Sequence, residues 1–347
     1  MEDEVGQSRR DRVDGSGSNR RNPPSGRVSM AMVAARAGVS GQTVSRVVNG
    51  SPRVDPDTRA RVEHAMGELG YRPHRAARAL RTGRSQTIGL VVTTLATVGN
   101  SRMLQATAEA AAERGYAVTL VTATRGVADA FDRLAEQEVD GAIVLNEASA
   151  LVSDAQRPAG LHLVVVDASS EDGVTSVHSD HAGGAAAATR RLLALGGGGV
   201  HHLAGPADSF AAAERERGWR ETLVSAGVRP PAVVRGDWSA DSGYAAGAEL
   251  RMASAVFCAN DQMALGLLRA LSDYGRRVPE DVGVIGFDDV PDAANYRPPL
   301  TTIRQDFAAL AQRAVSALVD AIEGAAPAEG SGVIPTALVE RASTASR

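Results

Sequence analysis

The sequence predicts an all-α helix-turn-helix headpiece followed by an α/β core of two lobes. Between Val28 and Tyr71, three short helical segments are joined by Gly-containing turns. From Thr87 onward, apolar strand-like runs alternate with helical segments. The charge divides in the same way, because residues 1–84 hold 16 Arg against 9 acidic residues and residues 85–347 hold 21 Arg against 32. A basic headpiece on an acidic body is suited to a polyanionic partner at one end.

The composition restricts the class of protein. A chain of 347 residues has room for two or three domains and a large core. The single cysteine, Cys258, lies in an apolar run and argues for a reducing compartment without disulfides. No apolar segment follows Met1, and no run approaches the roughly 18 apolar residues of a membrane span. We therefore expect a cytoplasmic, nucleoid-associated protein without a membrane segment.

The first helix of the headpiece is expected over Met30–Ala37, with Ser29 as its N-cap. After a turn, Ser40 can cap a second helix from Gly41 to about Val48. A third helix is expected to begin at Asp55-Pro56, with Asp55 as its cap, and to end at Gly70. Apolar residues recur at helical spacing and should form one shared core: Val33, Val39, Val44, Val47, Val62, Met66 and Leu69.

This spacing is typical of a helix-turn-helix, whose second helix enters the DNA major groove. Its exposed face would carry side chains able to reach base edges and phosphates: Gln42, Thr43, Ser45, Arg46 and Asn49. The structural alternative is a small helical hairpin that caps another domain.

The motifs AGVS at 37–40, QTVSRVVN at 42–49 and YRPHRAA at 71–77 resemble the headpiece of the LacI family. The resemblance implies a sequence-specific DNA-binding transcriptional repressor. It implies base contacts from Gln42 and Arg46, and a minor-groove wedge from Leu80 within a hinge or linker at 73–85. Phosphate contacts are expected from Ser40, Thr43, Ser45 and Asn49. Further DNA-contacting positions are Ser29, Met30, Gly41 and Arg53.

The headpiece is expected to span 27–72, and the polar residues 1–26 are expected to form a disordered tail. Strands are predicted at 88–94, 116–122, 141–145, 161–167, 200–204, 256–258 and 282–287, with helices near 101–114, 127–138, 180–195, 207–226, 240–252, 260–273 and 306–323. The family resemblance implies two periplasmic-binding-protein-like (type I) lobes over 86–347, which bind an effector and form the dimer.

Asn260 and Asp288 lie just after predicted apolar strands, where parallel sheets bind their ligands, and Asp167 occupies an equivalent place at the end of another strand. Such side chains can pair with the vicinal hydroxyls of a sugar. The alternative is that they only cap the following helices. Trp238 lies beside turn residues, and an aromatic face packs well on a pyranose ring. Trp219, with Leu223 one turn later, is expected in the core.

The resemblance is dense in GDWSA, ANDQMALG and PPLTTIRQDF, all within 236–307. It maps effector-binding positions onto Arg125, Asp167, Arg215, Trp238, Asn260, Asp288, Gln305 and Phe307, with Thr93 and Met103 in a less similar part of the lining. For Arg215, a solvated ion pair with Glu214 or Glu216 is the alternative. A galactoside or glucoside is the expected effector. A purine corepressor, or a sugar-binding module without DNA function, is the alternative.

Enzyme functions find no support in the sequence. His178, His181, His201 and His202 lack Cys or carboxylate partners at metal-ligand spacing, so structural roles are expected for them. The glycine runs do not form a phosphate loop. No cofactor is expected. After Arg341 there are no leucine heptads, so we expect a homodimer without a coiled-coil tetramerisation tail. An extracytoplasmic binding protein would share the two lobes but would lack the headpiece.

Overall fold

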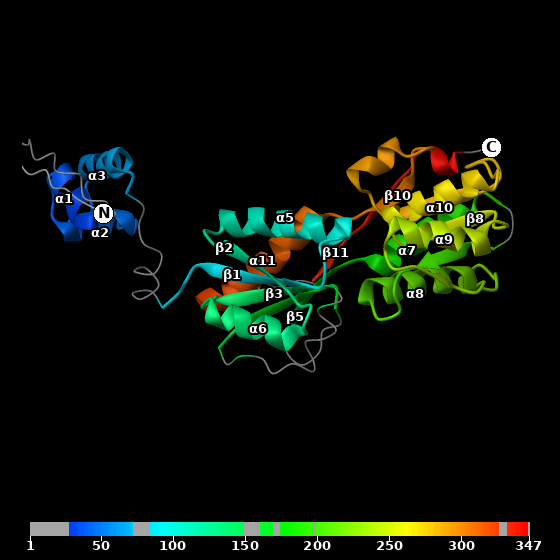
Figure 1. Cartoon of the computed structure of the whole chain (residues 1–347), viewed down its shortest axis with the longest axis horizontal. Helices are drawn as coiled ribbons and strands as arrows, with labels where there is room; N and C mark the ends of the chain where they lie inside the picture. The colour runs from blue at the N-terminus through cyan, green and yellow to red at the C-terminus, as the bar shows by residue number, and fades with distance from the viewer. Residues whose placement is uncertain are drawn as a thin grey trace, which may run out of the picture. The chain divides into compact units, whose positions relative to one another are not determined.

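The computed structural model describes residues 28–71, 83–146, 148, 158, 160–168, 174–196, 199–325 and 332–345. The chain separates into two compact units, residues 1–77 and 78–347 (Figure 1). The tail expected at 1–26, and Leu80 with most of the expected linker, lie outside the described residues.

The headpiece contains three helices at the positions predicted from the sequence: α1 (Met30–Ala37), α2 (Gly41–Val48) and α3 (Pro56–Leu69). The three predicted N-caps are confirmed, because each side chain accepts a hydrogen bond from a backbone N–H in the first turn of its helix. These caps are Ser29, Ser40 and Asp55. Gly38 and Gly70 end α1 and α3 in the left-handed conformation, which glycine adopts without a side-chain clash.

A single apolar cluster holds the headpiece helices together. Val33, Val44 and Val62 are fully buried at its centre, one from each helix. Of the seven residues predicted for this core, four belong to the buried cluster, which also includes Tyr71 immediately after α3. The other three, Val39, Met66 and Leu69, are partly buried and pack against it. Burial of this shared core allows three helices that are too short to be stable alone to fold together.

The N-terminal lobe of the second unit is a sheet in the order β11-β5-β4-β3-β1-β2, with every neighbouring pair parallel. Helices α5 and α11 pack on one face of the sheet and α6 on the other (Figure 1). The strands are β1 (Thr87–Val92), β2 (Ala117–Thr122), β3 (Gly141–Leu145), β4 (His162–Val166), β5 (Thr175–Ser179) and β11 (Val333–Ile334). The helices are α5 (Val98–Glu113), α6 (Val127–Glu136) and α11 (Phe307–Glu323).

The C-terminal lobe has a second sheet, in the order β12-β10-β9-β8-β6-β7. Helices α9 and α10 cover one face, and α7 and α8 cover the other. The strands are β6 (His201–Ala204), β7 (Val234–Arg235), β8 (Ala255–Cys258), β9 (Gly283–Asp288), β10 (Thr301–Arg304) and β12 (Ala337–Val339). The helices are α7 (His181–Leu193), α8 (Phe210–Ser225), α9 (Ala240–Leu250) and α10 (Asp261–Asp273). Short 3-10 turns follow at Pro291–Asn295 and Ala342–Thr344.

The chain crosses between the lobes three times: from β5 to α7, from β10 to α11 and from β11 to β12. The first and third crossings are joined, because the Thr336 hydroxyl donates to the Asp180 carbonyl across 3.1 Å. The predicted α/β lobes are confirmed. Five short strands (β5, β7, β10, β11 and β12) were not predicted from the sequence. Within the described residues, no helix is long and apolar enough to cross a membrane.

Candidate functional site

The first candidate site is the outer face of α2 in the headpiece. Val44 and Val47 turn into the core, and this leaves Gln42 and Arg46 exposed on the opposite side. At the start of the helix, the Ser40 and Thr43 hydroxyls lie 2.9 Å apart. Asn49, at its end, contacts Ser45 through its side-chain amide. The face therefore presents an arginine, an amide and several hydroxyls, which are the groups that read base edges and bind phosphates.

The remaining residues predicted to contact DNA differ in exposure. Ser29, Gly41 and Arg53 are exposed, while Met30 is partly packed against the headpiece core. Leu80 lies outside the described residues. Arg36 on α1 belongs to a different surface, where it forms an ion pair of 2.7 Å with Glu68 on α3.

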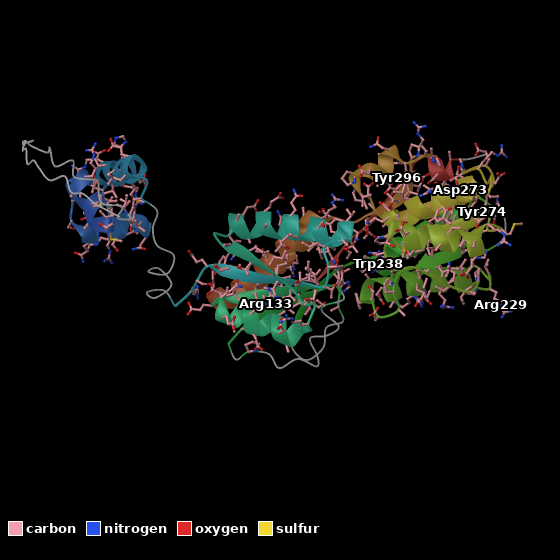
Figure 2. The ribbon with its side chains drawn as sticks, in the orientation of Figure 1. Arg133, Arg229, Trp238, Asp273, Tyr274 and Tyr296 are labelled. Carbon is pink, nitrogen blue, oxygen red and sulfur yellow. The ribbon has the colours of Figure 1, made fainter. Side chains whose placement is uncertain are left out.

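The second candidate site is a pocket between the two lobes of the second unit. Trp238 lies at this boundary in Figure 2. The pocket is lined by residues from both lobes: Thr97, Gly99, Asn100, Met103, Asn146, Asp167, Ser209, Ala211, Arg215, Trp238, Asn260, Asp288, Gln305 and Phe307.

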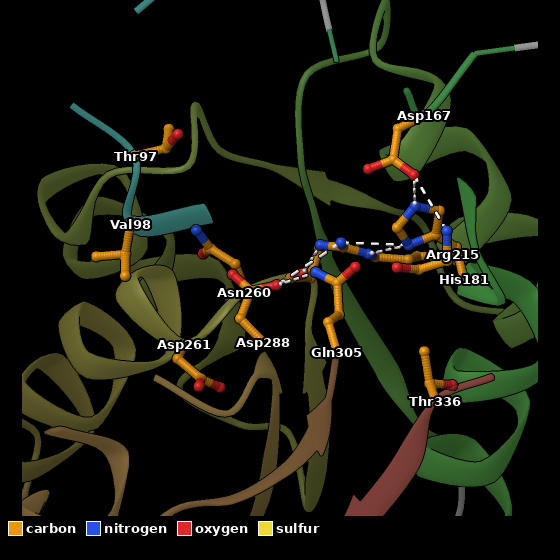
Figure 3. Close-up of polar contacts among 12 residues, drawn as sticks. Thr97, Val98, Asp167, His181, Arg215, Asn260, Asp261, Asp288, Gln305 and Thr336 are labelled. Carbon is orange, nitrogen blue, oxygen red and sulfur yellow. Dashed lines mark hydrogen bonds and ion pairs between the residues drawn. The ribbon is translucent and has the colours of Figure 1, made fainter. Parts of the chain in front are cut away.

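A buried network of polar side chains forms the floor of the pocket (Figure 3). The Nε2 atom of His181 lies 2.8 Å from Asp167 Oδ1, and Arg215 donates to His181 Nδ1 across 3.4 Å from Nε and 3.3 Å from Nη2. On its other side, Arg215 Nη2 lies 3.7 Å from Asp288 Oδ1, and Gln305 donates to the same carboxylate oxygen across 2.7 Å. The arginine thus lies between two buried carboxylates, one from each lobe.

The two carboxylates have different electrostatic environments. Burial alone would raise the pKa of Asp167, but the His181 imidazole and the Arg215 guanidinium outweigh it, so its pKa lies below the usual value. At Asp288 burial prevails over the favourable contacts with Arg215 and Gln305, and the pKa is raised. Both side chains can accept hydrogen bonds from ligand hydroxyls, and within the described residues Gln305 Oε1 is a buried acceptor without a hydrogen-bond partner.

Asn260 caps helix α10 and also forms part of the pocket wall. Its Oδ1 accepts from the backbone N–H of Met263 across 2.9 Å, so Asn260 caps α10, as the alternative interpretation required. Its Nδ2 donates to the Trp238 carbonyl across 3.0 Å, which fixes the turn that carries the tryptophan. The Arg215 guanidinium lies 5.5 Å from the centre of the Trp238 ring. Capping and pocket formation are therefore compatible roles of one side chain.

Backbone strain is concentrated around the pocket. Four of its residues adopt a positive φ: Asn146 (48°), Asp167 (53°), Trp238 (74°) and Asp288 (113°). Asparagine and aspartate tolerate this region, whereas a tryptophan adopts it rarely. The indole also lies against Gly205, where an added Cβ would approach the ring to 2.3 Å. Such strain persists where the surrounding structure fixes it and is characteristic of ligand sites.

The structure brings together most of the predicted effector-binding residues. Eight line the pocket: Met103, Asp167, Arg215, Trp238, Asn260, Asp288, Gln305 and Phe307. Thr93 instead lines a neighbouring opening, which shares Thr97 and Trp238 with the pocket. Arg125 is exposed in the turn after β2 and does not contribute to the lining.

Sequence reasoning missed several residues of the site, among them His181, Asn146 and Ser209. His181 was considered only as a metal ligand, yet it connects Asp167 with Arg215. Asn146 and Ser209 also line the pocket. The position of Asn146 directly after β3 was an available signal, because the carboxyl ends of parallel strands meet at the ligand-binding edge.

The structure distinguishes between the alternative roles of Arg215 and Trp219. Arg215 contacts His181 and the Ala259 carbonyl instead of forming the solvated pair with Glu214 or Glu216. Trp219 is fully buried, as expected for a core residue. Within the described part of the chain, no group of three or more His, Cys, Asp or Glu side chains is placed to hold a metal ion.

Comparisons with known proteins identify the family of both units of the chain. Residues 29–74 match the family described as "Bacterial regulatory proteins, lacI family", and residues 189–344 match a periplasmic binding protein-like domain. The lactose operon repressor of Escherichia coli is 36% identical over 328 residues, covering 91% of each chain. The transcriptional regulator CelR of Thermobifida fusca is 38% identical over 325 residues, covering 86% of this chain and 93% of CelR.

Solved structures show the same relationship. The lac repressor dimer bound to operator and the anti-inducer ONPF superposes with a TM-score of 0.80 at 35% identity, covering 92% of this chain and 99% of the repressor chain. The CelR–cellobiose complex gives a TM-score of 0.68 at 36% identity, covering 91% of this chain and all of that chain. These relatives are transcriptional regulators and not enzymes. The chain belongs to the LacI family and is a DNA-binding transcriptional repressor with a periplasmic-binding-protein-like domain.

Proposed function

We propose that the chain binds a pseudo-palindromic operator as a homodimer and that a galactoside or glucoside in the interlobe pocket controls its operator affinity. The observation that carries this proposal is the pocket itself. It combines two buried carboxylates, one arginine and one strained tryptophan within a single cleft. Carboxylates and arginine suit vicinal hydroxyls, and the indole face suits the apolar side of a pyranose ring.

For DNA recognition, we assign base contacts to Gln42 and Arg46, both exposed on α2. Arginine pairs with the two major-groove acceptors of guanine, and glutamine pairs with adenine. Phosphate contacts are assigned to Ser40, Thr43, Ser45 and Asn49. The remaining DNA-contact assignments, Ser29, Met30, Gly41, Arg53 and Leu80, rest on the family resemblance. Because Gly41 has no side chain, it contributes no base contact through one.

A sugar is favoured over a purine by the character of the polar lining. Hydrogen-bonding groups are distributed over both lobes, and they include the acceptors Asp167, Asp288 and Gln305 Oε1. A ring with several hydroxyls satisfies such a distribution better than a flat base does. The CelR relative was solved as a cellobiose complex, whereas PurR relatives of 32% identity point to the purine alternative.

Control of operator affinity follows from the two-lobed construction of the pocket. A ligand that contacts both walls binds best at one particular separation of the lobes. It therefore shifts the equilibrium between two arrangements of the core by its difference in affinity for them. The expected consequence is a change in operator affinity, with release of DNA as the favoured direction.

The dimer interface is assigned to the outer surface of α9 and α10. This surface exposes Tyr244 (41%) and Leu265 (41%), and Tyr274 (51%) lies directly after α10 (Figure 2). Clustered apolar exposure of this kind on a folded domain is typical of an interface. A two-fold dimer would place two headpieces on successive half-sites.

The test is operator binding by the Arg46→Ala variant, measured by gel shift on the DNA upstream of the gene. Loss of one base contact should weaken specific binding by about 10- to 100-fold and relax base choice at one position in each half-site. Arg36→Ala is the matched control, since Arg36 is an exposed arginine already paired with Glu68 on another surface. Unchanged operator binding by Arg46→Ala would refute the assignment of α2. Sugar binding without any operator binding by the wild type would favour a sugar-binding module.

A further inference from the structure

We propose that the wall of the pocket formed by Asn100 and Asn146 is a subsite for a second, hydroxylated sugar unit. The pocket would then select a disaccharide over a glycoside with an apolar substituent. This inference rests on the proposed function, because it assumes that the first unit is a sugar held by Asp288, Arg215 and Asn260. It adds the class of the second unit and the residue that selects it.

Hydrogen bonds fix the orientation of both side-chain amides: a backbone carbonyl orients Asn100, and Asn100 in turn orients Asn146. Asn100 is 1% exposed, and its Nδ2 donates to the Thr94 carbonyl across 2.9 Å. This bond leaves Asn100 Oδ1 directed at Asn146, whose Nδ2 donates to it. Asn146 must therefore present its own Oδ1 elsewhere. Among the described residues, no hydrogen bond reaches that oxygen, although Asn146 lines the pocket.

The surroundings of this pair are suited to a second ring. Asn100, Asn146, Thr97 and Gly99 belong to the N-terminal lobe, whereas Arg215, Asn260 and Asp288 belong to the C-terminal lobe. At Gly99, an added Cβ would find its nearest neighbour at 4.0 Å, so this wall is not closely packed. The adjoining opening is also rich in polar side chains: Thr93, Thr94, Thr97, Asp208, Asp237, Ser239 and Gln262.

A hydroxylated unit and an apolar substituent should differ in binding free energy at this wall. A hydroxylated unit satisfies Asn146 Oδ1, whereas an apolar substituent covers that oxygen and leaves it without the water to which it would otherwise bond. A site built around a hydrogen bond rejects a ligand lacking the matching group more strongly than an apolar site rejects a hydroxyl. Discrimination of about tenfold or more against the apolar substituent is expected.

The experiment compares matched ligands on the full-length protein by calorimetric titration. The pairs are lactose with phenyl β-galactoside, and cellobiose with phenyl β-glucoside, so that each pair shares its first sugar. The variant is Asn146→Gly, because glycine accepts the positive φ of 48° at this position and removes only the amide. The control variant is Asn260→Ala, which acts on the shared first sugar. Thermal unfolding verifies that each variant is folded.

We expect the wild type to bind one disaccharide at least tenfold more tightly than its phenyl partner. Asn146→Gly should reduce that preference about tenfold and leave phenyl glycoside binding nearly unchanged. Asn260→Ala should weaken both ligands equally. An equal loss of both ligands in Asn146→Gly, or no preference in the wild type, would overturn the subsite. If no sugar of either pair binds the wild type, the failure lies in the proposed function.

Discussion

Arg215 donates to the Nδ1 atom of His181, and the opposite nitrogen of the same ring lies 2.8 Å from Asp167. A guanidinium group has only donors, so His181 Nδ1 must be an acceptor. The other ring nitrogen, Nε2, donates to the Asp167 carboxylate. One imidazole thus connects the arginine of the C-terminal lobe with a carboxylate of the N-terminal lobe.

Replacement of His181 by Phe should keep the volume of the ring and remove both hydrogen bonds. Asp167 would lose one of its buried donors and Arg215 one of its acceptors, so effector affinity should fall at least tenfold and stability by about 1–3 kcal/mol. Calorimetric titration and thermal unfolding measure the two effects. His178→Phe is the control, because that histidine is only half-buried and contacts Phe210 edge-on. Wild-type affinity in His181→Phe would show that the ring does not position the site.

A second buried histidine should make stability depend on pH. His202 is fully buried between Phe257 and Trp219, with ring centroids 4.7 Å and 5.3 Å away, and its Nδ1 contacts the Phe257 carbonyl. Burial lowers its pKa from 6.5 to about 4. Below pH 6.5 His202 is therefore protonated in the unfolded chain, whereas in the folded chain it stays neutral until the pH approaches 4. The free energy of unfolding should fall by roughly 3 kcal/mol between pH 6.5 and 4.

The measurement is urea unfolding of the wild type and of His202→Asn across this pH range. Asparagine keeps a donor for the Phe257 carbonyl but does not titrate, so the variant should lose most of this pH dependence. His162→Asn, which changes an exposed histidine, should retain it. Equal slopes for the wild type and His202→Asn would contradict the assignment.

The site residues that could be predicted from the sequence are those marked by a pattern in the neighbouring residues. Asp167, Asn260 and Asp288 lie at or just after the ends of apolar strands, and this placement, together with Trp238, indicated a ligand site at that edge. His181 had no such signal, because its partners Asp167 and Arg215 are 14 and 34 residues away in the sequence. Tertiary contacts of this range leave no periodic pattern.

The same reasoning explains the missed strands. β10 (Thr301–Arg304) has only four residues, follows a proline-containing turn and carries no alternation long enough to be recognised. β11 and β12 are shorter still and exist because they pair with β5 and β10. In contrast, the helices of the headpiece were located correctly because their caps and glycine stops are local.

Replacement of glycine by alanine should have opposite effects on stability at Gly266, where α10 packs closely against α9, and at Gly67, which has open space around it. At Gly266 an added Cβ would lie 1.8 Å from the Ala240 carbonyl oxygen, and this backbone clash should force the helices apart. Gly266→Ala should therefore destabilise the core by about 1–3 kcal/mol or more. At Gly67 in α3 nothing lies within 4 Å, and Gly67→Ala should stabilise that helix by about 0.5–1 kcal/mol. Amide hydrogen exchange reports each helix separately; slower exchange in α10 of Gly266→Ala would disprove the packing argument.

Intrinsic fluorescence can identify the class of effector, since the chain has only two tryptophans. Trp238 lines the pocket, whereas Trp219 is fully buried and donates to the Val200 carbonyl across 2.9 Å. A sugar stacked on the indole of Trp238 should change the emission of the wild type and of Trp219→Phe, but not that of Trp238→Phe. Titration with β-galactosides, β-glucosides and purines provides the comparison. A response to purines alone would replace the sugar assignment with the corepressor alternative. A sugar response retained in Trp238→Phe would move the ligand away from this indole.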